Sequence, residues 1–170
     1  MKKVIEIGCP GAGKSTFARR LASASGLPLY YLDMLWHRPD RTTAGAEEFD
    51  AALREIARGD EWIIDGNYLR TLDARLSACD TVFFLDYPLD VCLEGARARL
   101  GQPREDMPWT DEELDPEFRL FIEGFPHLQL PAIYEILSDY EGKRDIFIFH
   151  SREEAEKWFA DNETQLKISR

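Results

Sequence analysis

The stretch Gly8-Cys9-Pro10-Gly11-Ala12-Gly13-Lys14-Ser15-Thr16 decides the fold of this chain. It matches the pattern G-x-x-x-x-G-K-[ST], in which glycines let the backbone curl so that successive N–H groups point inward at an anion. In this pattern the lysine reaches the β- and γ-phosphates, and the next hydroxyl completes the coordination of Mg²⁺. A mostly apolar run at 4–7 precedes the stretch, and apolar residues at helical spacing follow it. Strand, loop and helix in this order predict a site for a nucleoside triphosphate, with its phosphates at a helix N-terminus.

Composition limits the class of protein. The 170 residues suit a single domain, 1–170, and a hydrophobic content of 44% excludes a wholly disordered chain. No apolar run has the length needed to span a membrane, and Lys2 and Lys3 precede only a short strand, which does not fit a secretory signal. The three cysteines form no C-x-x-C pair, so we expect reduced thiols and a cytoplasmic protein. The formal net charge of −11 argues against direct binding of duplex DNA.

Segments with strand character alternate with segments of helical spacing, which favours a parallel sheet with helices on both faces. We expect strands at 4–7, 29–32, 62–66, 81–86 and 146–149. We expect helices after the phosphate loop, at about 49–57 and 89–100, from a capping box at 110–113 to Pro126, at 131–137, and from a second capping box at 151–154 with fraying from about Asp161. The predicted fold class is α/β: a doubly wound, five-stranded parallel sheet in three layers, with the ligand at the carboxyl ends of the strands.

Acidic residues end three of the predicted strands. Asp65 ends an apolar strand, and a buried carboxylate is costly unless a cation is near, so we expect it to hold a water on Mg²⁺ together with Ser15. The alternatives are a turn role before Gly66, or Asp86 in place of Asp65 at the metal. Asp33 ends the second strand and is placed to accept the proton of an acceptor hydroxyl, although a cap or turn role fits it almost equally well.

Three arginines, Arg97, Arg99 and Arg104, lie on the helix after the fourth strand and in the Pro- and Gly-containing loop beyond it. Charge spreads over the equatorial oxygens of a phosphoryl group during transfer, and planar guanidinium donors suit those oxygens. A closing loop would also exclude water, which is a competing acceptor. Surface solvation explains any one arginine equally well, but the position of the cluster after the fourth strand favours a mobile loop that brings arginine to the transferred group.

The phosphate loop, Asp33, Asp65-Gly66, and Asp86-Tyr87-Pro88 before an arginine-bearing helix occur together in this chain. In this combination the chain resembles adenylate kinase and its nucleoside-monophosphate-kinase relatives. More specifically, segments 63–68 and 104–107 resemble the bacterial proteins called DNA topology modulation proteins, or adenylate-kinase-related kinases. The resemblance covers nearly the whole chain.

The resemblance implies a P-loop NTPase fold of nucleoside-monophosphate-kinase type, ATP with Mg²⁺, and transfer of a phosphoryl group to a small acceptor. It also implies an acceptor-binding insertion at about 34–60 and a lid-like region at about 95–125. The implied nucleotide-binding residues are Gly8, Pro10, Gly11, Ala12, Gly13, Lys14, Ser15 and Thr16 in the loop, Arg99 as the second lid arginine, and Ser151 and Arg152 near adenine. The implied metal residues are Ser15 and Asp65.

Three positions depart from the adenylate-kinase pattern. Gly95 stands where the first lid arginine is expected, so that role is missing or passes to Arg97. Trp36 stands where those kinases have an arginine on the monophosphate, and Arg70 is displaced by one residue from another such arginine. These departures argue against AMP as the acceptor. Trp36 either stacks on a ring of the acceptor or packs as a core aromatic.

The leading hypothesis is an ATP-dependent kinase that acts on a nucleotide or a hydroxylated metabolite. Its expected catalytic residues are Lys14, Asp33, Asp65, Arg99 and Arg104. The alternatives are a regulatory nucleotide-binding protein linked to DNA topology and a simple ATPase. The expected partners are ATP and a small-molecule acceptor, without a membrane, and the sequence fits a monomer or a homodimer.

Overall fold

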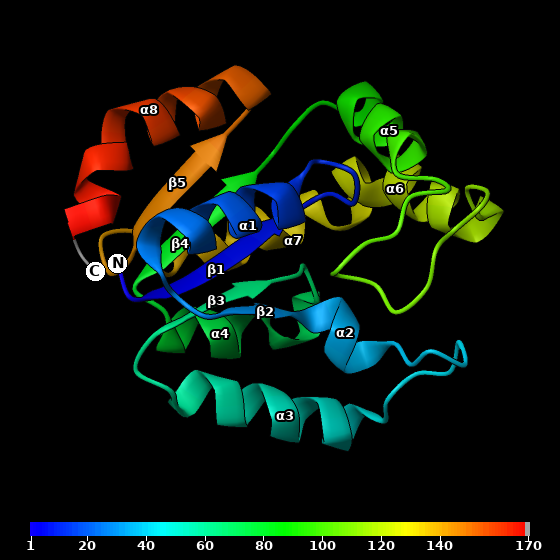
Figure 1. Cartoon of the computed structure of the whole chain (residues 1–170), viewed down its shortest axis with the longest axis horizontal. Helices are drawn as coiled ribbons and strands as arrows, with labels where there is room; N and C mark the ends of the chain where they lie inside the picture. Colours follow the sequence, from blue (N-terminus) through cyan, green and yellow to red (C-terminus); the bar gives the residue numbers. More distant parts are fainter. Residues whose placement is uncertain (169–170) are drawn as a thin grey trace.

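A computed structural model describes residues 1–168 of the chain (Figure 1). The strands are β1 (Lys3–Gly8), β2 (Leu29–Tyr31), β3 (Trp62–Asp65), β4 (Thr81–Leu85) and β5 (Asp145–Phe149). The helices are α1 (Lys14–Ser25), α2 (Leu32–Trp36), α3 (Ala46–Arg58), α4 (Leu72–Ala78), α5 (Leu89–Ala98), α6 (Pro116–Leu128), α7 (Leu130–Ser138) and α8 (Arg152–Ile168), with a short 3₁₀ helix η1 (Leu69–Thr71).

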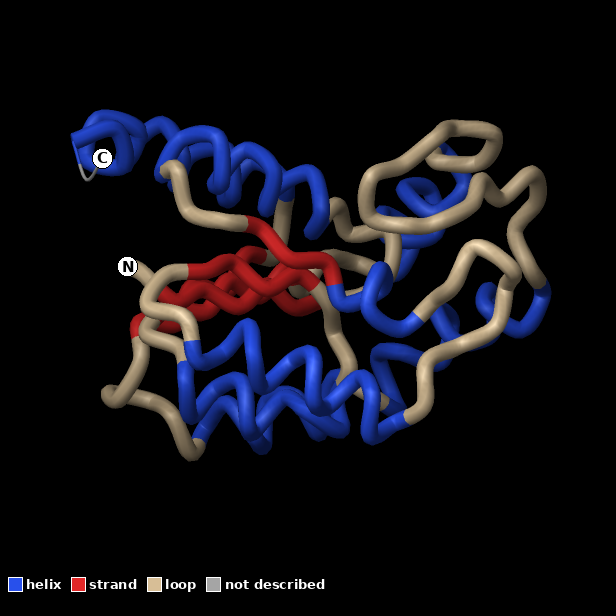
Figure 2. The backbone as a smooth tube through the Cα atoms, turned by 60° about the horizontal axis from the view of Figure 1, so that its bottom comes forward, coloured by secondary structure: helices blue, strands red, loops and turns tan. Residues whose placement is uncertain are grey.

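The strands form one parallel sheet in the order β2-β3-β1-β4-β5. Figure 2 shows the sheet as a band between two layers of helices. Because β1 lies in the centre and the chain winds away from it in both directions, a crevice is expected beyond its carboxyl end. The predicted doubly wound, five-stranded, three-layer α/β fold is confirmed.

Aromatic side chains attach the helices to both faces of the sheet. On one face, Phe83 of β4 contacts Phe17 of α1, with ring centroids 4.9 Å apart, and Trp158 of α8 at 4.7 Å. On the other face, Phe84 contacts Tyr134 of α7 at 5.4 Å. Strand residues alternate between the faces, so these neighbouring phenylalanines anchor opposite layers.

Helix α5 lies directly against the phosphate loop, backbone to backbone. A Cβ atom built on Gly95 would lie 2.0 Å from the carbonyl oxygen of Gly11, and one built on Gly11 would lie 2.0 Å from that of Cys92. Gly11 also has a φ of +86°, a conformation that favours glycine. The glycine at position 95 is therefore required by packing, which explains why no longer side chain stands there.

Three predicted helix ends were wrong. The capping box at 110–113 does not start a helix; α6 begins at Pro116, and the carboxylate of Asp115 accepts the N–H of Phe118 at 2.8 Å. Pro126 lies inside the last turn of α6. It has no N–H group and so removes one helix hydrogen bond, but the helix continues past it to Leu128. Helix α8 continues past the predicted fraying point, because Leu166 is buried against the core.

The segment after β3 was not predicted to be helical, yet it holds η1 and α4. Its organising residue is Arg75, which is buried and donates hydrogen bonds to the carbonyl oxygens of Gly66 at 2.7 Å and Tyr68 at 3.1 Å, and to that of Asn67. A buried arginine that donates to backbone carbonyl oxygens stabilises a turn whose carbonyl groups are not paired in a helix or a sheet. The turn carries cavity residues described below.

Within residues 1–168, no helix is both long and apolar enough to cross a bilayer. Among these residues the cysteines at 9, 79 and 92 are buried, and none of them forms a disulfide.

The contact between α5 and the phosphate loop gives a direct prediction. Gly95→Ala should lower the free energy of unfolding by about 1–3 kcal/mol, because the added methyl group pushes the helix away from Gly11. It should also weaken the ATP binding that the sequence predicts, because a displaced helix would distort the loop packed against it. Urea unfolding and calorimetric titration with ATP measure the two effects.

The matched control is Gly45→Ala, since a Cβ there meets nothing within 4 Å and its φ of −69° suits any residue. Equal behaviour of the two variants would contradict the proposed packing role of Gly95.

Candidate functional site

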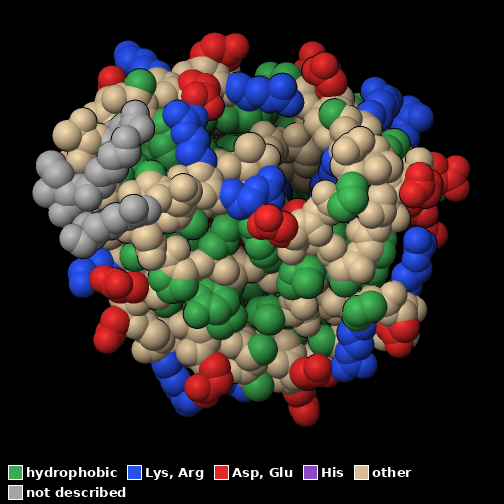
Figure 3. Space-filling model, viewed as in Figure 1, with side chains coloured by type: hydrophobic (Ala, Val, Ile, Leu, Met, Phe, Trp, Pro, Cys, Tyr) green, Lys and Arg blue, Asp and Glu red, His purple; other side chains and the backbone are tan. Residues whose placement is uncertain are grey.

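A cavity of about 1010 Å³ opens at the carboxyl ends of the strands. The phosphate loop and Asp65 line it on one side, and residues of α2, of η1 and of the segment 99–118 line the rest. In Figure 3 this face is hollowed above and to the right of its centre, with Lys, Arg, Asp and Glu side chains at the edge. The crevice predicted from the strand order is therefore present and bordered by charge.

The phosphate loop has the curled backbone that the motif predicts. Gly11 and Gly13 have φ angles of +86° and +99°, and α1 starts directly after them at Lys14. The Nζ atom of Lys14 donates to the carbonyl oxygen of Cys9 at 3.2 Å, which holds the ammonium group across the loop. The first N–H groups of a helix have no carbonyl within the helix to bond, so this end of α1 is a natural anion site.

Two carboxylates lie buried beneath the loop. Asp65 is 4% exposed, and its Oδ1 atom has no hydrogen-bond partner among the described residues. Burial raises the pKa of Asp65 to about 6, against a lowering by Lys14 and by the Ser15 hydroxyl. Glu6 of β1 pairs with Asp65 in the sheet and is fully buried, and neither of its carboxylate oxygens has a hydrogen-bond partner among the described residues. Burial, and to a smaller extent the nearby Asp65 carboxylate, raises the pKa of Glu6 well above its ordinary range.

These groups fit a Mg²⁺ ion. An unpartnered buried carboxylate oxygen next to the Ser15 hydroxyl is the oxygen-donor chemistry that Mg²⁺ prefers. Residues 1–168 contain no group of three His, Cys, Asp or Glu side chains arranged to hold a metal by themselves. A Mg²⁺ ion held by Ser15 and Asp65 would therefore take its remaining ligands from water and phosphate, as Mg²⁺ commonly does in nucleotide sites.

Asp106 is a site residue that the sequence reasoning did not assign. It is 8% exposed and accepts hydrogen bonds from the Ser15 hydroxyl at 3.0 Å and from Arg104 at 3.2 Å. Arg19 of α1 lies 4.0 Å from its other oxygen. Asp106 therefore ties the segment after α5 to Ser15, at the end of the phosphate loop. The only signal in the sequence was its place in the segment 104–107.

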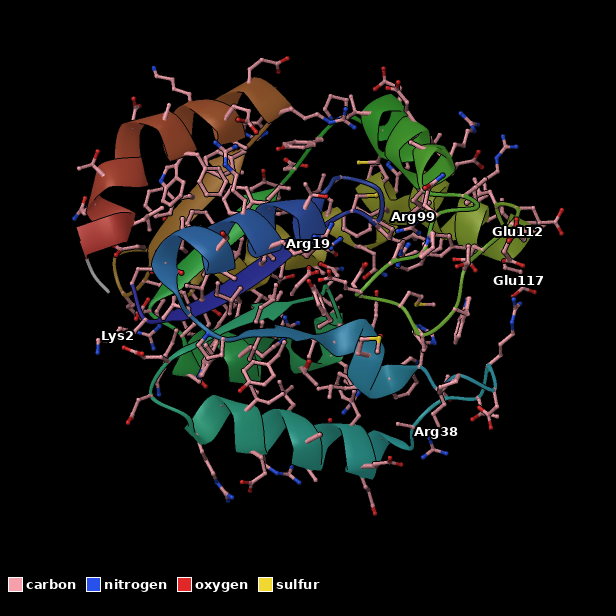
Figure 4. All side chains as sticks on the ribbon, viewed as in Figure 1. Lys2, Arg19, Arg38, Arg99, Glu112 and Glu117 are labelled. Atoms are coloured by element: carbon pink, nitrogen blue, oxygen red, sulfur yellow. The ribbon has the colours of Figure 1, made fainter. Side chains whose placement is uncertain are left out.

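The arginines of this segment divide into two groups. Arg99 and Arg104 line the cavity, and the guanidinium group of Arg99 lies 5.1 Å from the centre of the Phe118 ring. Burial, and to a smaller extent the positive charge of Arg104, lowers the pKa of Arg99. Figure 4 shows Arg99 beside the end of α5 and Arg19 on α1. Arg97 is exposed and does not line the cavity.

The other end of the cavity is aromatic. Asp33 lies in the first turn of α2 rather than at the end of β2, and its carboxylate accepts the Tyr68 hydroxyl at 2.8 Å. Trp36 makes edge contacts with Phe49 at 5.6 Å and Tyr68 at 6.2 Å while it also lines the cavity. Both expectations for Trp36, core packing and a surface for a ring, are thus compatible with its position. Arg70 lines the cavity but is bonded to Asp50 through both ends of its guanidinium group, at 2.9 and 2.7 Å.

Asp86, the alternative metal residue, faces a different region. Its carboxylate accepts the Tyr134 hydroxyl at 2.6 Å and lies 3.4 Å from Nδ1 of His150. It does not line the main cavity. Asp65 is therefore the strand-end carboxylate that the fold places near Ser15.

A second, smaller cavity of about 390 Å³ lies on the other side of the loop. Gly11, Gly13 and Thr16 line it together with Arg152 of α8. Ser151 does not line it; its hydroxyl accepts the N–H of Glu154 at 3.2 Å, as predicted for a helix cap. This is the region where the family resemblance implies adenine.

Comparisons with protein-family models and with curated protein sequences give no match. Solved structures match nearly the whole chain. A gluconokinase from Sinorhizobium meliloti 1021 is 18% identical, with 97% of this chain and 91% of that chain covered and a TM-score of 0.60. A shikimate kinase from Acinetobacter baumannii, in complex with shikimate, is 18% identical, with 99% and 94% covered and a TM-score of 0.60.

A sugar kinase from Janibacter sp. HTCC2649 is 20% identical, with 99% of this chain and 96% of that chain covered and a TM-score of 0.54. At these identities the similarity establishes the fold: this chain has the parallel, five-stranded fold of the P-loop kinases.

The burial of Asp65 predicts a pH-dependent cost in stability. Its pKa is about 6 in the folded protein and 3.8 ordinarily, so folding favours the neutral acid and stability is lost as pH rises between these values. Asp65→Asn should therefore raise the free energy of unfolding at pH 7.5 by up to about 3 kcal/mol, and the gain should vanish near pH 4. Urea unfolding with EDTA and without nucleotide measures it.

Asp60→Asn, at an exposed carboxylate before β3, is the control and should show no such gain. A variant at position 65 that is less stable than the wild type at pH 7.5 would contradict the argument.

Proposed function

We propose that this protein is an ATP-dependent phosphotransferase that acts on a small hydroxylated molecule. The observation that carries the proposal is one continuous cavity, with an anion-binding loop at one end and Asp33 among aromatic side chains at the other. Two arginines from a single loop line the same cavity. The fold is also that of solved gluconate, shikimate and sugar kinases, which supports the same class of reaction.

The reaction needs no covalent intermediate. An acceptor hydroxyl oxygen bonds to the γ-phosphorus of ATP, the bond to the β,γ-bridging oxygen breaks, and ADP leaves. Lys14 and the loop amides bind the β- and γ-phosphates, and Ser15 and Asp65 hold Mg²⁺, which neutralises charge on the phosphate oxygens when bound. Asp33 orients the acceptor and takes its proton, and its hydrogen bond from Tyr68 fixes the carboxylate for this task.

The remaining residues act on charge and on water. Arg99 and Arg104 neutralise the transferred group, and Asp106 positions Arg104 next to Ser15. We assign acceptor binding to about 34–60 and the lid to about 95–125. Closure of that lid would remove water, the competing acceptor.

Within the P-loop kinases, segments 63–68 and 104–107 favour the adenylate-kinase-related group called DNA topology modulation proteins. We infer that any effect on DNA topology is indirect, because a formal net charge of −11 opposes binding to duplex DNA. Adenine would lie in the smaller cavity beside Arg152, and Ser151 would cap the N-terminus of α8 next to it. A cytoplasmic location fits the free cysteines, and we propose either a monomer or a homodimer.

The test is production of ADP from ATP and Mg²⁺ with a panel of hydroxylated metabolites. We expect turnover that depends on one acceptor class, and we expect Lys14→Ala to lower kcat/KM by about 10²-fold or more. Lys157→Ala, at an exposed lysine on α8, is the control.

ADP production that is the same with and without every acceptor would identify an ATPase instead. Unchanged ATP affinity of the Lys14→Ala protein by calorimetry would overturn the assignment of the loop.

A further inference from the structure

The wall of the main cavity opposite the phosphate loop has a chemistry that selects among acceptors. We define the acceptor wall as Asp33, Trp36, His37, Asn67, Tyr68 and Trp109, all of which line the cavity. Building on the proposed function, we propose that this wall binds a non-anionic acceptor with hydroxyl or amino donors and an apolar face, and disfavours acceptors that carry phosphate or carboxylate.

Two indole rings provide apolar surface. Trp36 and Trp109 are half-buried, each held by an edge contact: Trp36 to Tyr68 at 6.2 Å, and Trp109 to His37 at 5.1 Å with an interplanar angle of 76°. The Nε1 atom of Trp109 donates to Asp111 at 2.9 Å, which fixes the ring further. Rings held in this way offer flat faces to the C–H face of a sugar or another ring, and to an ammonium group.

Two oxygens of the wall can accept further hydrogen bonds, one on Asp33 and one on Asn67. Asp33 receives one bond, from Tyr68, and a carboxylate can accept several. The Oδ1 atom of Asn67 is buried and has no partner among the described residues. A hydroxyl or amino group of a ligand can donate to the Asp33 carboxylate. A phosphate or carboxylate is acceptor-only when ionised, so it cannot donate there and is repelled by Asp33.

The backbone turn that carries Asn67 and Tyr68 is fixed by hydrogen bonds from a buried arginine. Tyr68 has a φ of +25°, which is uncommon for a residue with a side chain. Arg75 holds this turn by donating to the carbonyl oxygens of Gly66, Asn67 and Tyr68. A strained turn of this kind persists only where its surroundings impose it, and here it presents Asn67 and Tyr68 to the cavity.

Cations near the wall are already engaged. Arg70 is bonded to Asp50 through two nitrogens, and the NH1 and NH2 groups of Arg75 are bonded to backbone oxygens. Arg41 lies over the ring of Trp109 at 5.6 Å and does not line the cavity. An anion at this wall would therefore have to displace an existing partner of an arginine.

The other cavity arginines belong to the phosphate end. Arg104 and Arg19 approach Asp106 at 3.2 and 4.0 Å, and Asp106 is bonded to Ser15 of the loop. Arg99 lies over Phe118. Positive charge thus gathers where the triphosphate is expected, and the acceptor wall contributes Asp33 as its charged group.

Matched pairs of acceptors test the proposal: adenosine against AMP, glucose against gluconate, and methyl shikimate against shikimate. ADP release is measured with each, and binding of each is measured by calorimetry in the presence of a non-hydrolysable ATP analogue and Mg²⁺. We expect the neutral member to be favoured by tenfold or more in kcat/KM or in affinity in the pairs that bind. Preference for the anionic members by a similar factor would overturn the proposal.

The two measurements separate failure of this inference from failure of the proposed function. Neutral members that bind without any ADP release would contradict the kinase assignment and support the wall chemistry. Release of ADP that depends on anionic members alone would support the kinase assignment and contradict the wall chemistry. No binding of any neutral member at millimolar concentration, with ATP binding intact, would also count against the wall.

A pair of variants tests the role of Asp50 as the partner that occupies Arg70. Asp50→Ala frees the guanidinium, and because exposed ion pairs are weak, the gain for anionic members should be roughly two- to fivefold. The double variant Asp50→Ala/Arg70→Ala should lose that gain. A single Arg70→Ala change that selectively abolishes use of anionic members in the otherwise wild-type protein would show that Arg70 already binds them, and would overturn the proposal.

Discussion

The contact between the backbone of α5 and the backbone of the phosphate loop constrains the whole site. Gly11 and Gly95 meet without a side chain between them, so the backbone of the loop packs directly against the backbone of the helix. The same helix leads into the segment that carries Arg99, Arg104 and Asp106 over the cavity. A close approach of two main chains thus couples the shape of the anion site to the position of the residues that act on the transferred charge.

Two buried carboxylates beneath the phosphate loop lower the stability of the fold and suit the site to a cation. Glu6 and Asp65 are neighbours across two central strands, and both lack partners for carboxylate oxygens. Such groups destabilise a fold when no cation is present. Their retention beside Lys14 and Ser15 is expected where a metal and a polyphosphate complete the charge balance, so part of the stability of the protein is given up to prepare the site.

The fold could be predicted because the motif at 8–16 comes with its strand and helix, and because apolar runs mark five strands. Asp65 was predictable as the polar end of such a run. Asp106 and Arg75 were not, because a buried charge in a loop or short helix has no periodic signal and depends on partners distant in sequence. Asp33 was placed on a strand although it lies in α2, since five residues are too few to show helical spacing.

The central claim is that the curled loop and the buried carboxylate beside it hold a metal-bound triphosphate. A crystal structure with a non-hydrolysable ATP analogue and Mg²⁺ tests this most directly. The account predicts the β-phosphate within the loop from Gly11 to Ser15, and the metal between Ser15 and a water held by Asp65. Phosphates bound elsewhere, or a metal with no path to Asp65, would contradict it.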